Sequence, residues 1–217
     1  GVIDKKTVNE YVDLFVNYKL KVLAALDAHI DTTASFKQEF LQYRDQQIRP
    51  FVLSDKDVEA EAHRIYNDTK QRVLAAGGMV RPAHILIRLG QKASAAEQDK
   101  AKYRADSLYQ VLRKGGNFAE LAKKYSDDKG SAVKGGDISW ITRGQTVKAF
   151  EDACFTMKMG EMSKPVLSEF GYHIIKLMGK QDFFSYDSVR NDICRFIDAR
   201  GIREHIIDVK LDSISKS

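Results

Sequence analysis

The sequence has few of the residues from which metal sites, disulfide frameworks and membrane spans are built. It holds two cysteines, Cys154 and Cys194, and their separation fits no zinc-binding or CxxC pattern. We therefore expect two unreactive thiols and no metal site, and two positions alone leave the question of a disulfide open. No apolar run approaches the roughly 18 residues that a membrane-spanning helix needs, so we also expect no membrane span.

Hydrolase signatures are absent as well. The chain contains neither GxSxG nor HExxH, the short motifs that mark common serine and zinc hydrolases. Serine, histidine and aspartate occur in any chain of this size, so their presence alone does not indicate a catalytic triad. The first residue is Gly1, with no methionine or apolar leader before it, and we interpret the chain as an excised segment from which any signal peptide has been removed.

Charge is unevenly distributed. The net charge is +5, and residues 1–80 carry 11 basic and 12 acidic side chains, residues 81–180 carry 18 and 11, and residues 181–217 carry 6 and 7. The basic excess is thus confined to the middle segment. Its charges are scattered among acidic ones and form no basic run interleaved with aromatic residues. We interpret them as a solvated surface and expect no nucleic-acid partner.

The first 80 residues have the apolar periodicity of helices. Apolar residues recur at gaps of three and four over 8–26 and again over 36–47, where we expect Pro50 to end the second helix. A capping box at 54–57 predicts a third helix, and the paired glycines 77–78 predict its end. The apolar stripes are narrow, so these helices have only a thin core of their own.

Strand and helix patterns alternate in the middle of the chain, and the tail is helical again. The pattern predicts, in order, a strand at 82–89, helices at 94–114 and 118–125, a polar loop at 126–137, a strand at 138–141, a helix at 147–155, and strands at 164–168 and 171–178. This order indicates an α+β fold with a small antiparallel sheet packed against helices. Residues 185–217 have helical periodicity, and we expect Gly201 to break or bend that helix.

Two histidines stand out within this segment. Each lies in a strand-like run with apolar neighbours, RPAHILI around His84 and GYHIIKL around His173. One buried histidine in a strand is usually a core residue with satisfied hydrogen bonds. Two of them, with the loop Gly135–Trp140 between them in the sequence, suggest a shared site.

Several blocks match a known family in order and spacing. The succession AHILIR, NFAELAKKYSDD, GGDISW, RGQTVKAFEDACF and GEMSKPVLSEFGYHIIKL resembles the parvulin family of peptidyl-prolyl cis–trans isomerases, from about Arg81 to Lys180. The resemblance implies an isomerase domain at 81–180, between a helical chaperone-like region at 1–80 and a helical segment at 181–217. This layout resembles that of the extracytoplasmic foldases PrsA and SurA. It implies unfolded polypeptides with X–Pro bonds as substrates, and a periplasmic or otherwise extracytoplasmic location.

The parvulin resemblance also assigns roles to four catalytic residues. His84 and His173 match the two central histidines of the family, which lie on adjacent strands with their rings close together. Asp128 falls where members carry Cys or Asp, and Ser168 falls on a hydroxyl residue that bonds a histidine. Three alternatives stay open: Asp128 as a turn cap, Ser168 as an ordinary strand residue, and Phe150 as plain core.

Four further residues match the walls of a proline pocket. Phe150 matches the aromatic wall, and Ile138 adds an apolar side. Thr146 stands where many parvulins have Met, so a weaker grip on the proline ring and low activity are expected. Phe170 stands at a position that is often small and polar, and we expect it to alter access to the pocket.

The implied reaction needs no nucleophile, metal or cofactor, because only rotation about an amide bond is catalysed. Arg88 and Lys92 offer two separated charges where phosphate recognition would need several convergent cations, so we expect no preference for phosphoserine–proline. The alternative function is a holdase chaperone that keeps the parvulin fold with little or no isomerase activity.

Overall fold

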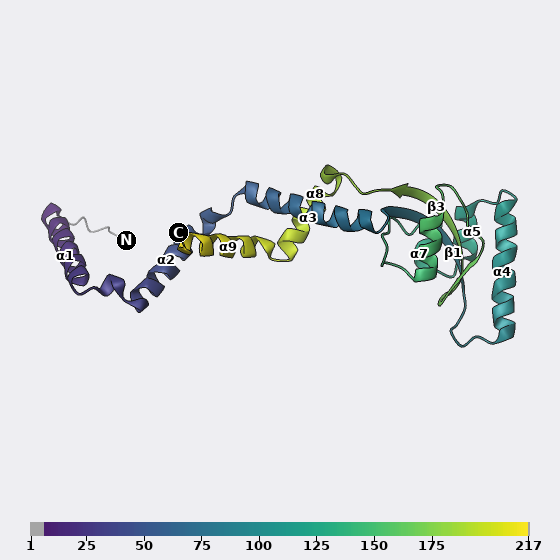
Figure 1. The fold of residues 1–217 in the computed structure, drawn as a ribbon, viewed down its shortest axis with the longest axis horizontal. Coiled ribbons are helices and arrows are strands. Elements are labelled where there is room, and N and C mark those ends of the chain that lie inside the picture. The colour runs from purple at the N-terminus through teal and green to yellow at the C-terminus, as the bar shows by residue number, and fades with distance from the viewer. Residues whose placement is uncertain (1–6, 217) are drawn as a thin grey trace. The chain divides into compact units, whose positions relative to one another are not determined.

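The computed structural model describes residues 7–216, and the chain divides into two compact units. One unit consists of Gly1–Glu61 together with Cys194–Ser217, and the other of Ala62–Ile193. The divisions fall inside two helices, α3 (Asp55–Ala75) and α8 (Tyr186–Ala199), which are labelled in Figure 1.

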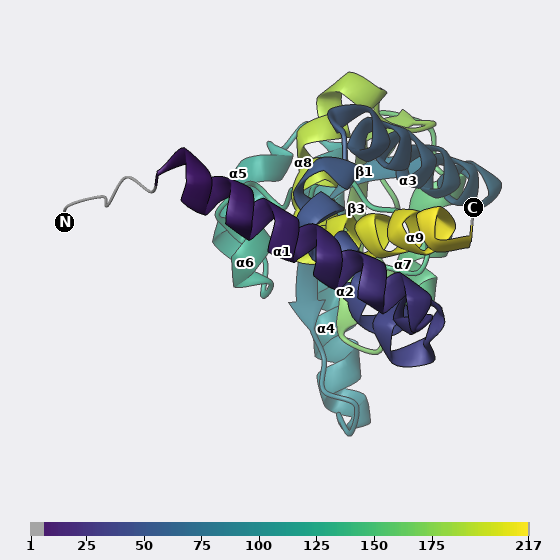
Figure 2. The same cartoon turned by 90° about the vertical axis from the view of Figure 1, so that its left-hand side faces the viewer.

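The first unit is helical. It contains α1 (Val8–Asp27), a short 3₁₀ helix η1 (Ile30–Thr32), α2 (Ala34–Val52) and α9 (Ile202–Lys216), with the adjoining parts of α3 and α8. A capping box between Thr7 and Glu10 begins α1, and none of the residues of α1 or α2 is buried. Figure 2 shows α2 beside α9, and Arg49 ties the two helices through ion pairs to Glu204 and Asp208 at 2.6 and 2.9 Å.

Two expectations about helix ends had different outcomes. Pro50 lies within the last turn of α2, which ends at Val52, so the prediction that the helix stops at the proline was wrong. A proline removes one backbone hydrogen bond, and here helical geometry continues for two residues after it. The predicted break at Gly201 is confirmed, because this glycine has a φ of +65° and separates α8 from α9.

The second unit is built around a three-stranded antiparallel sheet in the order β1-β3-β2, formed by β1 (Met79–Arg88), β2 (Val166–Ser168) and β3 (Gly171–Gln181). Figure 1 shows α4 (Ala95–Arg113) and α5 (Phe118–Tyr125) on one side of the sheet and α7 (Lys148–Thr156) on the other. The predicted α+β class is therefore confirmed.

Because side chains alternate along a strand, the sheet has two apolar faces and two cores. On one face, Ala83, Ile85 and Ile87 of β1 pack with residues of α4 and α5. On the other face lie apolar residues of β1 and β3 together with residues of α7: Val80, Ile175, Leu177, Phe150, Cys154 and Phe155. The histidines alternate with the first set and belong to the α7 face.

The segment between α5 and α7 differs from its prediction in two places. Residues 138–141 form no strand, and only single bridges join Val80 to Ile141 and Ala83 to Asp137. The reason is local: Ser139 has a φ of +67°, which a strand cannot contain. The polar loop expected at 126–137 contains a short helix, α6 (Lys129–Ala132).

Strand ends also shifted. The strand predicted to begin at residue 82 begins at Met79, and the one predicted from 164 begins at Val166, directly after Pro165, which has no N–H to give to a ladder.

None of the helices within residues 7–216 combines the length and apolar character needed to cross a membrane.

Candidate active site

The centre of the site is the pair of histidine rings. His84 projects from β1 and His173 from β3, and their Nδ1 atoms lie 3.1 Å apart. The rings are nearly parallel, with centroids 5.4 Å apart and planes inclined by 15°. In the sheet register, Leu86 lies opposite His173, so His84 is its diagonal neighbour on the same face. Both side chains are buried, with 7% and 4% of their surface exposed.

Hydrogen bonds extend the pair at both ends. His84 Nε2 lies 2.8 Å from Asp128 Oδ2, and His173 Nε2 lies 2.7 Å from Ser168 Oγ. An ionised Asp128 can only accept, so the proton between it and His84 is on Nε2. His84 Nδ1 then accepts from His173 Nδ1–H, and Ser168 O–H donates to His173 Nε2. Hydrogen bonds donated in one direction, from Ser168 through His173 and His84 to Asp128, thus join all four side chains with each imidazole carrying one proton.

Asp128 is fixed by contacts at both of its carboxylate oxygens. In agreement with the capping alternative, it is the N-cap of α6, where Oδ1 accepts from Gly130 N–H at 3.2 Å. The contacts with Ser131 were not predicted from the sequence. Ser131 donates to Oδ2 at 2.5 Å and also lies 3.1 Å from His84 Nε2. A serine three residues after a helix cap faces back to that cap, and this spacing was the available signal. Burial raises the pKa of Asp128, but hydrogen bonds from Ser131 and His84 outweigh it, and the net pKa lies below its usual value.

The pKa of His173 is displaced in the direction that keeps the ring neutral. Burial, with a smaller contribution from the neighbouring His84, lowers it to about 4. The His173 ring is therefore neutral near pH 7, as the proton arrangement described above requires.

A mostly apolar pocket of about 430 Å³ opens above the two rings. It is lined by His84, Ile138, Gln145, Thr146, Val147, Phe150, Phe170 and His173. The Phe150 ring meets both imidazoles edge to face, with centroids 5.5 Å from His84 and 5.3 Å from His173. The sequence-predicted pocket residues thus line one cavity, and Gln145 and Val147, which were not predicted, complete it.

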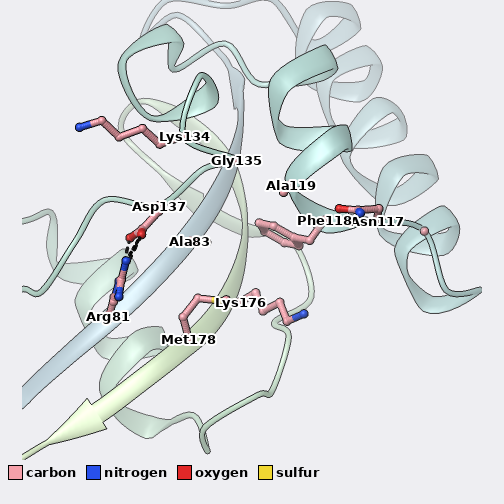
Figure 3. Close-up of a pocket in the computed structure, with 11 residues that line it drawn as sticks. Arg81, Ala83, Asn117, Phe118, Ala119, Lys134, Gly135, Asp137, Lys176 and Met178 are labelled. Carbon is pink, nitrogen blue, oxygen red and sulfur yellow. Dashed lines mark hydrogen bonds and ion pairs between the residues drawn. The ribbon is translucent and has the colours of Figure 1, made fainter.

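A different pocket lies on the opposite face of the sheet. It has a volume of about 520 Å³ and is lined by residues of β1, α5 and β3 and by the loop that bears Asp137. Figure 3 shows Arg81 and Asp137 directed toward one another on one side of it, where they form an ion pair at 2.5 Å. Phe118 and Lys176 lie on the other side. No imidazole lines this pocket and its acid is already paired, so the histidine pocket is the stronger candidate.

Comparison with known proteins identifies the family of the chain. The family model described as the PPIC-type PPIASE domain matches residues 64–181, more than half of the chain. The chain belongs to this family. The PpiC-type match includes both histidines, Asp128, Ser168 and all the pocket residues.

Relatives of this PpiC-type chain include foldases and chaperones. Foldase protein PrsA of Geobacillus kaustophilus is 34% identical over 161 residues, which are 74% of this chain and 50% of that protein. Chaperone SurA of Chromobacterium violaceum is 36% identical over 156 residues, or 70% and 35%. The chain thus spans half or less of the length of these two relatives. The crystal structure of peptidylprolyl isomerase (PrsA) from Bacillus anthracis is 26% identical, with a TM-score of 0.43, and covers 96% of this chain and 82% of that one.

Two pocket residues of this PpiC-type domain have unusual surroundings. The Thr146 hydroxyl is buried and has no hydrogen-bond partner among the residues that the structure describes, which costs about 1–3 kcal/mol for a buried polar group. Phe170 lies at the rim with 53% of its surface exposed, and its N–H donates to Ser168 Oγ at 3.1 Å. It therefore joins the pocket entrance to the hydroxyl that bonds His173.

The cysteines take no part in the histidine pocket. Both are free thiols, and burial, followed by the nearby Glu151 carboxylate, raises the pKa of Cys154 to about 12. This thiol is protonated at neutral pH and unreactive. Within residues 7–216, no cluster of three or more His, Cys, Asp or Glu side chains is arranged to hold a metal ion.

Proposed function

We propose that this chain is a peptidyl-prolyl cis–trans isomerase that acts on X–Pro bonds in unfolded polypeptides. The observation that carries the proposal is the hydrogen-bonded histidine pair under an apolar pocket. The proposed catalytic residues are His84, Asp128, Ser168 and His173, and the proposed substrate-binding residues are Ile138, Thr146, Phe150 and Phe170.

The reaction explains why such a site suffices. Rotation about the X–Pro bond faces a barrier of about 18–20 kcal/mol, because the partial double bond of the amide is lost in the twisted state. The twisted imide is less dipolar than the planar one, so an apolar cavity favours the twisted form more than water does. A catalyst therefore needs to hold the proline ring and to bind the twisted form more tightly than the planar form.

The residues divide this work between them. Phe150 and Ile138 offer apolar walls to the pyrrolidine ring. The ionised Asp128 acts through its field and through His84, and no covalent bond to substrate is needed. Ser168 holds His173, which in turn holds His84, so the tautomer of the pair is fixed before substrate arrives.

A proline-limited refolding reaction tests the proposal. Wild-type chain is expected to accelerate the slow phase in proportion to its concentration. In the double variant His84→Ala/His173→Ala, that acceleration is expected to be smaller by about tenfold or more. His205→Ala, which removes an exposed histidine on α9, is the matched control and is expected to retain it. An equal rate with and without wild-type chain would defeat the proposal.

A second candidate, the holdase, is favoured by α1. No residue of this helix is buried, and most of its apolar side chains are exposed, including Phe15 and Tyr18 at 60% each. An exposed apolar face of this kind can bind unfolded polypeptide. Suppression of client aggregation that survives the double histidine substitution would support this function beside catalysis.

We also propose a location outside the cytoplasm, on the resemblance in layout to PrsA and SurA. Fractionation of cells that express the full gene product tests it. Recovery in the cytoplasmic fraction alone would contradict it.

A further inference from the structure

Glu151 is a buried carboxylate that the catalytic proposal does not use. It lies on α7, directly after Phe150, and only 7% of its surface is exposed. Its Oε1 accepts from the backbone N–H groups of Gly144 and Thr146, each at 2.8 Å. Glu151 does not line the histidine pocket itself, but Thr146, which it holds, does.

These bonds fix the loop that precedes α7. The N-cap of α7 is Val147, whose side chain cannot cap a helix, and no side-chain cap bond is present. Glu151, in the first turn, instead reaches back over the helix N-terminus, where a negative charge is favourable. The chain turns at Gly144, with a φ of +88°, and passes over the carboxylate so that Gln145, Thr146 and Val147 form one wall of the pocket.

The electrostatics of Glu151 agree with an anchoring role. Burial raises its pKa, but backbone hydrogen bonds from Thr146, Gly144 and Gln145 outweigh burial, and the net pKa lies below the usual value. The group is thus an anion at neutral pH. A buried anion that is satisfied by several N–H donors holds them in place firmly, because losing them would leave an uncompensated charge.

We infer that Glu151 is a positioning residue that sets the wall of the proline pocket by holding residues 144–147 against the N-terminus of α7. The inference rests on the proposed isomerase function for its kinetic consequence. It gives α7 two tasks, since the same helix presents Phe150 to the histidines and holds a loop that lines the same pocket.

The test compares Glu151→Ala and Glu151→Gln with Asp152→Asn. The glutamine keeps an acceptor oxygen in place and is the conservative variant. Asp152 is the matched control, because it is the adjacent acid on the same helix and its ion pairs with Arg143 and Lys148, at 3.2 and 2.6 Å, are partly exposed to solvent. Each variant is measured well below its melting temperature, on a short X–Pro peptide.

Three results are expected. In Glu151→Ala the KM, and the Kd from NMR titration of the peptide, rise about tenfold while kcat changes little, because the wall is displaced and the histidine pair is intact. Hydrogen-exchange protection of the Gly144 and Thr146 amides falls in the same variant. Glu151→Gln recovers most of both effects, and Asp152→Asn matches wild type throughout.

The inference is overturned if a folded Glu151→Ala chain keeps wild-type KM, peptide Kd and amide protection. If Glu151→Ala does not fold, Glu151→Asp takes its place, because its carboxylate is withdrawn by one methylene from the Gly144 and Thr146 N–H groups. Unchanged amide protection together with unchanged Kd in that variant is again negative. Failure of the proposed function is a separate result: a wild-type chain without turnover can still show whether peptide Kd depends on Glu151.

Discussion

At the scale of single residues, Asp128 both caps a helix and contacts a histidine of the proposed site. The sequence left open whether it caps a turn or belongs to the site. Its two oxygens separate the tasks, since Oδ1 accepts from Gly130 N–H as the cap of α6 and Oδ2 bonds His84. The cap places the carboxylate, so the local structure and the hydrogen bond to the histidine depend on one another.

The substitution Asp128→Asn tests this division. Asparagine is also a good helix N-cap, so we expect the free energy of unfolding to change by no more than about 1 kcal/mol. The charge beside His84 is lost, and kcat/KM is expected to fall about tenfold or more. Urea unfolding and peptide kinetics on the same preparation check both. Wild-type kcat/KM would contradict a role for the carboxylate charge.

The pKa of His173 predicts how stability depends on pH. Its value in the folded chain, about 4, lies below the ordinary histidine pKa of 6.5, so between these pH values the unfolded chain binds the proton more readily. The contribution of His173 to the free energy of unfolding is fully present above pH 6.5 and falls as the pH drops. At pH 4 the free energy of unfolding has decreased by an amount on the order of 3 kcal/mol.

Urea midpoints measured from pH 7 to pH 4 check this prediction, and His173→Gln is expected to flatten the dependence. His205→Gln, on the exposed surface of α9, is the control and should keep the wild-type slope. Equal slopes in wild type and His173→Gln would show that another group is responsible.

At the scale of elements, the site depends on a close approach between a loop and β1. Gly136 has a φ of +87°, its carbonyl accepts from His84 N–H at 2.8 Å, and a Cβ on it would lie only 2.4 Å from the His84 carbonyl oxygen. The sequence indicates only that this glycine lies in the loop Gly135–Trp140. The contact with His84 could not be read from it, because it joins residues far apart in the chain.

Gly136→Ala is therefore expected to destabilise the fold and to disturb His84. Gly160→Ala is the matched control, with a similar φ of +83° but nothing within 4 Å of the added Cβ. In both variants the alanine must adopt a left-handed backbone conformation, which lowers the free energy of unfolding by about 1–3 kcal/mol. Gly136→Ala is expected to lower it by at least about 1 kcal/mol more. Urea unfolding measures the difference. Equal losses in the two variants would mean that the loop can move away from β1.

At the scale of the whole molecule, the sequence predicted much of the architecture because local patterns specify it. Alternation located β1 and β3, and helical stripes located most of the helices. The strand predicted at 138–141 failed because one residue with positive φ, Ser139, interrupts it. Four residues were found only in the structure: Ser131, Gln145, Val147 and Glu151. They act through hydrogen bonds or as part of the pocket wall, and the periodicity of a sequence does not reveal either.

The helical unit and the sheet-containing unit are predicted to carry different activities. We expect Phe15→Ser/Tyr18→Ser on α1 to weaken suppression of client aggregation severalfold, because both side chains are exposed apolar surface. Turnover of a short X–Pro peptide is expected to stay unchanged. Asn17→Ser on the same helix is the control. Light scattering and peptide kinetics measure the two effects, and a parallel loss of both would contradict the separation.

Exchange spectroscopy by NMR on a short X–Pro peptide tests the central claim most directly, because it observes rotation of the bond itself. Without catalyst the two isomers interconvert in tens to hundreds of seconds, too slowly for exchange cross-peaks. The account predicts cross-peaks between cis and trans signals on adding wild-type chain, with a rate proportional to its concentration, and none with His84→Ala/His173→Ala. Absence of cross-peaks at equimolar wild-type chain, or their persistence in the double variant, would contradict it.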